Sequence, residues 1–178
     1  AGITELPSQK ELAERYFRVT ANIDLDAICS NILNTRKLVG NKTLIMAIIK
    51  ADGYGHGAIP IAKALDEIGV DAYGIAIIEE GIELRNNGIK KPLLILGYTP
   101  KEQYKQLVQY DISQTIFQLS AANDLSKEAL SQNKIAKIHI KLDTGMSRIG
   151  FSDTEESIEE IKKIDRKSTR LNSSHPLD

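Results

Sequence analysis

The sequence has little that would tie the chain together covalently or carry it into a membrane. It contains one cysteine, Cys29, which excludes an internal disulfide and is typical of a reducing cytoplasm. We expect Cys29 to be a small buried helix residue rather than a nucleophile. No apolar run approaches the roughly 20 residues of a membrane-spanning helix, and the first residues contain no apolar signal core. These absences favour a cytoplasmic protein.

An excess of charge of one sign is also missing. The 23 Lys and Arg residues nearly balance the 24 Asp and Glu residues, which gives a formal net charge of −1. Because the sequence shows no basic face, we expect neither a nucleic acid nor an anionic membrane as partner. The 178 residues are enough for one domain with a substantial hydrophobic core.

The stretch TLIMAIIKADGYGHGA, residues 43–58, dominates the sequence. Residues 44–49 are all apolar, and Lys50 follows them directly, before a loop rich in glycine. A short apolar run bounded by turn residues predicts a strand buried on both faces, as in a parallel sheet. Desolvation at the end of such a strand makes an amine more nucleophilic, as a Schiff-base lysine requires. The plain alternative is a lysine that marks the exit of the strand into solvent.

The glycine loop by itself has a second interpretation. Residues 53–58 fit the pattern G-x-G-x-x-A of a dinucleotide-binding turn, and Glu79 and Glu80 follow where a ribose-binding acid is expected. However, residues 50–52 separate the strand from the first glycine, whereas that turn normally follows its strand directly. A nucleotide-binding module with an open sheet therefore stays an alternative.

A second unusual stretch, KIAKIHIKLDTGMSRIGF, covers residues 134–151. In a strand over residues 134–142, alternation places Lys137, His139 and Lys141 on one face. Three cationic groups on one face are costly to desolvate. This strand is therefore either an exposed edge, where lysine is common, or its face lines a polar pocket that contains anions.

Strands and helices alternate along the chain. We expect strands at 18–25, 44–50, 71–78, 92–96, 112–117 and 134–142, and helices at 27–39, 59–68, 79–87, 99–110, 119–131 and 154–164. Residues 1–18 are polar and helix-prone. This alternation predicts consecutive βα units and a parallel sheet. Because a closed eight-stranded barrel needs roughly 250 residues, the length alone favours an open doubly wound sheet.

Both unusual stretches resemble the alanine racemases. KADGYGHG is similar to that family's pyridoxal-phosphate motif, which implies that Lys50 bonds the cofactor covalently and that Tyr54 reaches its phosphate. KLDTGMSRIGF is similar to the family segment in which the lysine here at 141 is carbamylated by carbon dioxide and pairs with Arg148. The resemblance implies that Arg148 in turn reaches the cofactor's phenolic oxygen and the substrate carboxylate.

The resemblance extends over residues 16–164, since IDLDAI (23–28) and YGIAIIEEGIELR (73–85) are also similar to family segments. It implies an α/β fold, with an incomplete (β/α)8 TIM-type barrel over residues 19–164. It further implies pyridoxal 5′-phosphate as cofactor, no metal, interconversion of L- and D-alanine for peptidoglycan, and a homodimer for the full-length protein. A serine racemase of the same family and a stand-alone pyridoxal-phosphate barrel are the alternatives.

The family continues beyond this sequence into the last barrel units and a C-terminal β domain, which supplies the second base across the dimer interface. We therefore expect the 178-residue chain to be inactive by itself.

The last residues lack the periodicity of the preceding helix. DRKSTRLNSSH, residues 165–175, reproduces the translation of a common sequencing-library adapter, whereas the alternative is a native disordered basic tail. We expect residues 165–178 to be a non-native tail, and we do not interpret Ser168, His175 and Asp178 as a triad.

Overall fold

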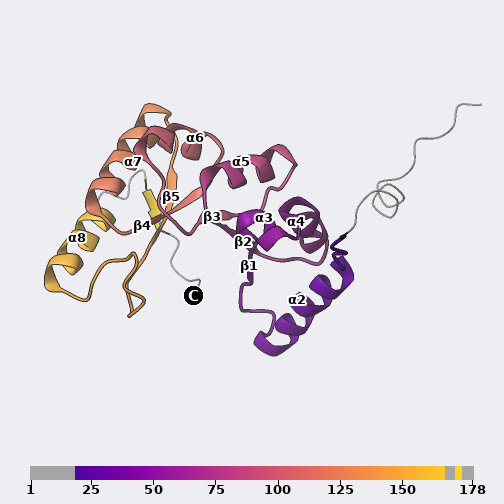
Figure 1. Cartoon of the computed structure of the whole chain (residues 1–178). Helices are drawn as coiled ribbons and strands as arrows, with labels where there is room; N and C mark the ends of the chain where they lie inside the picture. The colour runs from indigo at the N-terminus through magenta and orange to yellow at the C-terminus, as the bar shows by residue number, and fades with distance from the viewer. Residues whose placement is uncertain (1–18, 167–170, 174–178) are drawn as a thin grey trace, which may run out of the picture.

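The computed structural model describes residues 19–166 and 171–173, and its centre is a six-stranded parallel sheet (Figure 1). The strands are β1 (Met46–Ile48), β2 (Ala72–Ile75), β3 (Leu93–Ile95), β4 (Ser113–Ile116), β5 (Ala136–Ile140) and β6 (Leu171–Ser173). The helices are α2 (Leu25–Val39), α3 (Lys50–Gly55), α4 (Ala58–Glu67), α5 (Ile78–Asn86), α6 (Tyr104–Gln109), α7 (Leu119–Ser131) and α8 (Glu155–Arg166), with a 3-10 turn, η1 (Lys101–Gln103), before α6.

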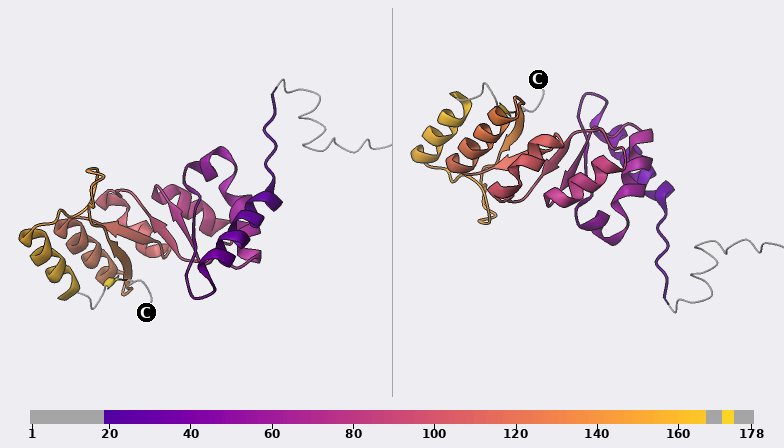
Figure 2. Two further views of the ribbon diagram at one scale, coloured as in Figure 1. Left: turned by 90° about the horizontal axis from the view of Figure 1, so that it is seen from below. Right: turned by 90° about the horizontal axis from the view of Figure 1, so that it is seen from above.

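The strands lie side by side in the same order as in the chain, from β1 to β6. A doubly wound sheet reverses its strand order at a switch point, whereas a barrel adds each strand on the same side. Helices α4 to α8 form an arc around the strands (Figure 1), and α2 and α8 lie at opposite ends of the row of units (Figure 2). The fold is therefore an incomplete (β/α)8 barrel, as the resemblance implied. The open doubly wound sheet favoured by the length is wrong.

The outer face of the sheet packs against the helices and forms the core. Its strand side chains are almost fully buried, among them Ala47, Tyr73, Ile75, Ile95, Ile116 and Ile138. The helices contribute buried apolar side chains to the same cluster, including Leu65, Leu84, Leu107 and Leu125. Removing this apolar surface from water is the main stabilising contribution to the fold.

The inner face of the sheet carries the alternate residues of each strand. The strand register places Ile48 beside Gly74, Gly74 beside Leu94, and Thr115 beside His139. A side chain at Gly74 would collide with the end of the Ile48 side chain, at 2.6 Å. The side chain of Ile48 is nevertheless 40% exposed. This face corresponds to the interior of a closed barrel, which side chains fill in layers.

The strand expected at residues 18–25 is wrong. Residues 19–24 form no strand, and helix α2 already begins at Leu25. Strand preference depends on a neighbouring strand, and here the expected helix cap decides the structure. The carboxylate of Asp24 accepts a hydrogen bond from the amide of Ala27 (2.9 Å). The polar helix expected for residues 1–18 lies outside the described residues.

The end of the chain also differs from expectation. Helix α8 continues to Arg166, and β6 pairs in parallel with the first three residues of β5, from Ala136 to Ile138. Strand β5 is therefore not an edge, and the edge interpretation of its lysine-rich face is wrong. Residues 167–170 and 174–178 lie outside the described residues, and the non-native origin of 165–178 stays a prediction. None of the described helices has the length and apolar composition of a membrane span.

Candidate active site

Lys50 follows β1 at the carboxyl end of the sheet. Ile45, Ala47 and Ile49 are buried on the outer face, and Lys50 comes directly after Ile49, whose ψ angle of 20° ends the extended backbone of the strand. The lysine side chain is half-buried. In barrels, the carboxyl ends of the strands carry the catalytic residues, and the predicted position of Lys50 agrees with this rule.

The segment labelled α3 is a left-handed turn rather than an ordinary helix. Ala51, Asp52, Gly53 and Tyr54 have φ angles of 52°, 52°, 62° and 58°. Left-handed conformation costs a non-glycine residue roughly 1–2 kcal/mol, so three of these residues need compensation from their surroundings. Two backbone hydrogen bonds of 2.8 Å help, from Gly53 N to the carbonyl of Ile49 and from Gly57 N to the carbonyl of Asp52.

Two carboxylates hold the ends of this turn. Glu80 accepts a hydrogen bond from the amide of Ala51 at 2.7 Å and another, on its second oxygen, from the amide of Ala76 at 2.7 Å. At the other end, Asp52 accepts a hydrogen bond from the amide of Ala58, also at 2.7 Å. Asp52 thereby satisfies the first amide of helix α4, a role that the glycine at the N-cap cannot take.

The turn brings Lys50 and Tyr54 close together. The amine nitrogen of Lys50 lies 5.9 Å from the centre of the Tyr54 ring, within the range of a cation–π contact. Tyr54 is 60% exposed, so its hydroxyl is accessible to a ligand. His56 lies next to the turn, with its Nδ1 atom 2.8 Å from the carbonyl oxygen of Gly53.

The dinucleotide interpretation of the glycine loop does not fit this geometry. A dinucleotide phosphate would need the free amides at the start of α4, but the carboxylate of Asp52 takes up the amide of Ala58. Both proposed ribose-binding acids are also engaged, because both oxygens of Glu80 accept backbone hydrogen bonds and Glu79 accepts a hydrogen bond from the side chain of Gln103.

The three cationic residues in and directly after β5 are accommodated separately. Lys137 forms an ion pair with Asp111 at 2.7 Å. Burial lowers the pKa of the His139 imidazole below its ordinary value of 6.5, which favours the neutral form near pH 7. Lys141 is half-buried at the end of the strand. The ion pair of Lys137 and the neutral form of His139 thus reduce the free-energy cost of desolvating three cationic groups on one face of the strand.

The loop after β5 folds back on itself. The amide of Phe151 donates to the carbonyl of Lys141, and the amide of Asp143 donates to the carbonyl of Phe151, both at 2.8 Å. Inside the loop, one oxygen of Asp143 accepts the amides of Gly145 and Ser147, both at 3.0 Å. These hydrogen bonds, from Ser147 and then Gly145, lower the pKa of Asp143 below its ordinary value.

Arg148 lies on this loop with its side chain exposed. Among the described residues it forms no hydrogen bond or ion pair with Lys141. Two unmodified cations repel, so the pairing implied by the resemblance requires the carbamate on Lys141. Strands β2, β3 and β4 separate Lys50 from Lys141, yet the carboxyl ends of parallel strands share one rim. The structure therefore places Lys50 and Lys141 at the same rim of the sheet, with three strands between them.

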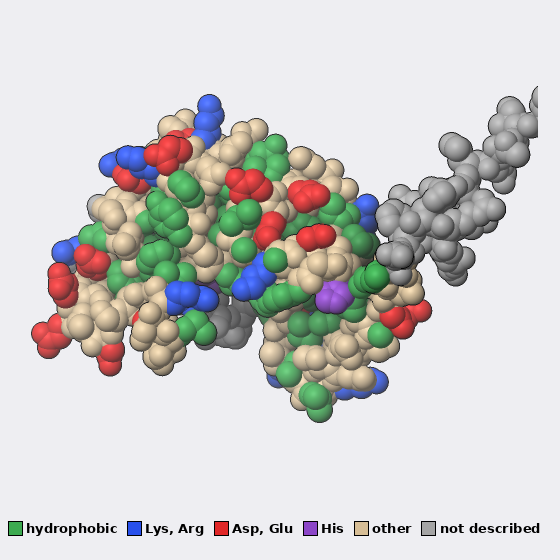
Figure 3. Space-filling model, viewed as in Figure 1, with side chains coloured by type: hydrophobic (Ala, Val, Ile, Leu, Met, Phe, Trp, Pro, Cys, Tyr) green, Lys and Arg blue, Asp and Glu red, His purple; other side chains and the backbone are tan. Residues whose placement is uncertain are grey.

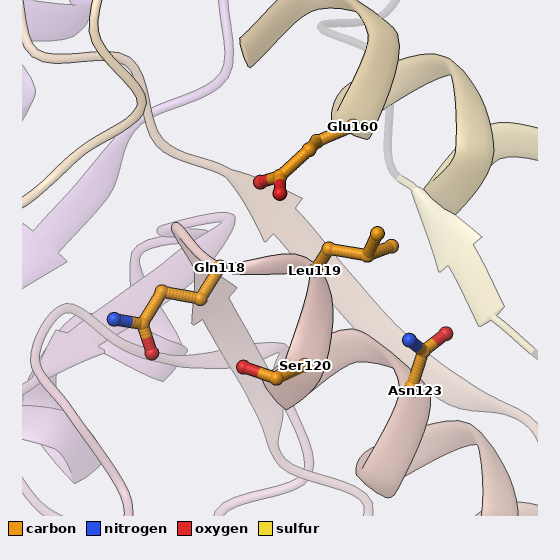
Figure 4. A pocket seen from close by; sticks show the side chains of 5 residues that line it. All are labelled: Gln118, Leu119, Ser120, Asn123 and Glu160. Atoms are coloured by element: carbon orange, nitrogen blue, oxygen red, sulfur yellow. The ribbon is translucent and has the colours of Figure 1, made fainter. Parts of the chain in front are cut away.

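A pocket of about 460 Å³ lies between α7 and α8. It is lined by Gln118, Leu119, Ser120, Asn123 and Glu160, and Figure 4 shows Glu160 of α8 facing the start of α7. None of the residues expected in the site lines this pocket. Within residues 19–166 and 171–173, no three His, Cys, Asp or Glu side chains are grouped so that they could hold a metal ion.

Comparisons with known proteins place this arrangement in context. Residues 23–175 match the family model "Alanine racemase, N-terminal domain". The chain is 51% identical over 140 residues to alanine racemase 1 of Caldanaerobacter subterraneus subsp. tengcongensis, which covers 79% of this chain and 36% of the relative. It is 47% identical over 146 residues to the alanine racemase of Clostridium novyi, which covers 82% of the chain and 38% of that relative.

A solved alanine racemase from Clostridium difficile 630 has the same fold. It superposes with a TM-score of 0.83 at 38% identity, covering 88% of this chain and 42% of the solved one. The chain thus spans well under half the length of the relatives and of the solved structure that it matches.

Proposed function

The chain belongs to the alanine racemase family, whose N-terminal domain it matches over residues 23–175, and we propose that it is the cofactor-binding part of a pyridoxal-phosphate-dependent alanine racemase. One observation carries the proposal: Lys50 lies just beyond the carboxyl end of β1, and a left-handed turn holds Tyr54 beside it. This is the position in which a barrel enzyme needs a covalently reactive amine.

The residues present fit pyridoxal 5′-phosphate. Lys50 offers the amine for a covalent bond with the cofactor's aldehyde, and the accessible hydroxyl of Tyr54 is a donor for its phosphate. Arg148 is a planar guanidinium with no partner among the described residues, and such a fork suits a phenolic oxygen or a carboxylate. The bound cofactor supplies an electron sink for the carbanion that forms at the substrate Cα.

In this proposal Lys50 moves the proton on one face of the substrate Cα, while Arg148 orients the substrate carboxylate. Racemisation also needs a proton donor on the opposite face, and none of the described residues is proposed for that role. We therefore propose that the full-length protein is active as a homodimer in the cytoplasm, where it supplies D-alanine for peptidoglycan. The carbamate on Lys141 is part of the same proposal.

The experiment that tests this function restores the missing part. The 178-residue chain alone should not racemise alanine. A chimera that joins residues 19–164 to the remaining length of the Caldanaerobacter relative should interconvert L- and D-alanine, and the matched Lys50→Ala chimera should not. Serine, assayed in parallel, decides between the two substrates. A folded, dimeric chimera that acts on neither amino acid, or an active 178-residue chain, would contradict the proposal.

A further inference from the structure

We propose that Glu80 is a positioning residue for Lys50, because it fixes the backbone that carries this lysine. The inference rests on the proposed function for the role of Lys50, but its geometry stands independently. Glu80 uses both carboxylate oxygens, at 2.7 Å each, on the amide of Ala51 and on the amide of Ala76. It thereby ties the loop after β1 to the loop after β2.

Lys50 is held from both sides by the β2–α5 unit. The residue before it, Ile49, donates its amide to the carbonyl of Gly74 on β2 at 3.0 Å. The residue after it, Ala51, donates to Glu80 in the first turn of α5. The Lys50 backbone is thus fixed between two anchors that belong to one βα unit, which limits the directions in which its side chain leaves the rim.

The placement of Glu80 is itself favourable. The start of a helix stabilises an anionic side chain, and Glu80 lies in the acidic first turn of α5. Hydrogen bonds from amides to a carboxylate are stronger than those between neutral groups. The bond to Ala51 also acts at the first left-handed residue of the turn, where φ is 52°. A strained turn persists only when its surroundings determine it, and Glu80 supplies that constraint at the position next to Lys50.

Two variants and one control separate this role from a general effect of charge. Glu80→Ala removes both acceptors. Glu80→Gln keeps the shape of the side chain but has only one carbonyl oxygen. Its NH2 group then faces a backbone N–H, which is also a donor, so one of the two hydrogen bonds is lost. Glu79→Gln removes the same charge one residue earlier, where the carboxylate only accepts a hydrogen bond from the side chain of Gln103 at 2.6 Å.

The first measurement is amide hydrogen exchange in the 178-residue chain without cofactor. Loss of a hydrogen bond to a charged acceptor should accelerate exchange roughly tenfold or more. We expect this at Ala51 and Ala76 in Glu80→Ala, at one of them in Glu80→Gln, and at neither in Glu79→Gln. Unchanged exchange at both amides in folded Glu80→Gln or Glu80→Ala would overturn the inference.

The second measurement follows the rate at which Lys50 is modified by pyridoxal phosphate and fixed with borohydride. In both Glu80 variants, pyridoxal phosphate should modify Lys50 roughly tenfold more slowly than in the original chain. Exposed lysines such as Lys63 should react at unchanged rates. Faster amide exchange with an unchanged Lys50 rate would also overturn the positioning role. If Lys50 is not modified even in the original chain, the proposed function fails. Amide exchange then still tests whether Glu80 accepts hydrogen bonds from Ala51 and Ala76.

Discussion

At the scale of single residues, the sequence alone suggested candidate reactive residues but not the residues that hold them in place. Lys50 and Tyr54 belong to one continuous motif, so their proximity follows from local spacing. Glu80 was weighed only as a ribose-binding acid. Its hydrogen bond to Ala51 joins residues 29 positions apart, and such a contact depends on how two βα units pack together. The acidic first turn of α5 was visible in the sequence, but its target was not.

His139 gives a residue-scale prediction for the pH dependence of stability. Burial lowers the pKa of its imidazole in the folded chain below 6.5. The unfolded chain then binds more protons at acidic pH, so the free energy of unfolding falls as the pH drops through about 6.5 towards the lowered value. We expect His139→Asn to reduce this loss of unfolding free energy at acidic pH. Urea unfolding at a series of pH values between about 7 and about 5 measures it. An equal loss in His139→Asn and in the original chain would refute the predicted contribution of His139.

At the scale of elements, one helix with regular apolar spacing matched its predicted bounds, whereas the irregular turn after β1 was not predicted. Helix α7 was predicted at residues 119–131 and is found there, because its apolar spacing and its bounds are both local. The α3 turn was expected to be a loop, since the residues of KADGYG do not specify four consecutive left-handed conformations. At residues 18–25 a strand was expected, although no described strand pairs with residues 19–24.

The loop after β5 gives an element-scale prediction. Gly150 has a φ angle of 143°, and a Cβ atom there would lie 2.4 Å from the amide nitrogen of Asp143. Gly145 has a comparable φ angle of 121° but open space around it. Both alanine variants should lose roughly 1–3 kcal/mol to backbone strain, and Gly150→Ala should lose about 1–3 kcal/mol more from the collision.

Urea unfolding of both glycine variants measures the difference. Because Gly150 closes the loop that carries Arg148, loss of order should be confined first to residues 142–151, as hydrogen exchange would show. Equal destabilisation by Gly145→Ala and Gly150→Ala would contradict the close approach seen in the structure.

At the scale of the whole molecule, the sequence predicted βα units but did not show whether they form an open sheet or part of a barrel. Alternation of strands and helices is common to open sheets and barrels, and the length favoured the open sheet. The strand order from β1 to β6 excludes the doubly wound alternative. Only the motifs pointed to a barrel, because they carry information about the family that the periodicity of this one chain does not contain.

The exposed inner face leads to a prediction for the whole molecule. Figure 3 shows apolar side chains on the surface among charges of both signs, and Ile48 on the inner face is 40% exposed. Exposed apolar surface beside unpaired strand edges promotes association. We expect the 178-residue chain to form oligomers with rising concentration, as measured by light scattering after gel filtration.

Ile48→Lys should weaken this association, because it places a charge on the inner face. Leu38→Lys is the matched control, since Leu38 is 87% exposed on helix α2, away from the sheet. A chain that stays monomeric at all concentrations, or equal effects of the two variants, would contradict the prediction.

The most direct test of the central claim is to locate the cofactor on the chain. The 178-residue chain is incubated with pyridoxal phosphate, reduced with borohydride and mapped by peptide mass spectrometry, with Lys50→Arg as control. The proposed site predicts modification concentrated on Lys50 and its loss in the variant, with other lysines unaffected. A folded chain that carries no modification on Lys50, or carries it evenly over its exposed lysines, would contradict the assignment of this rim as a pyridoxal-phosphate site.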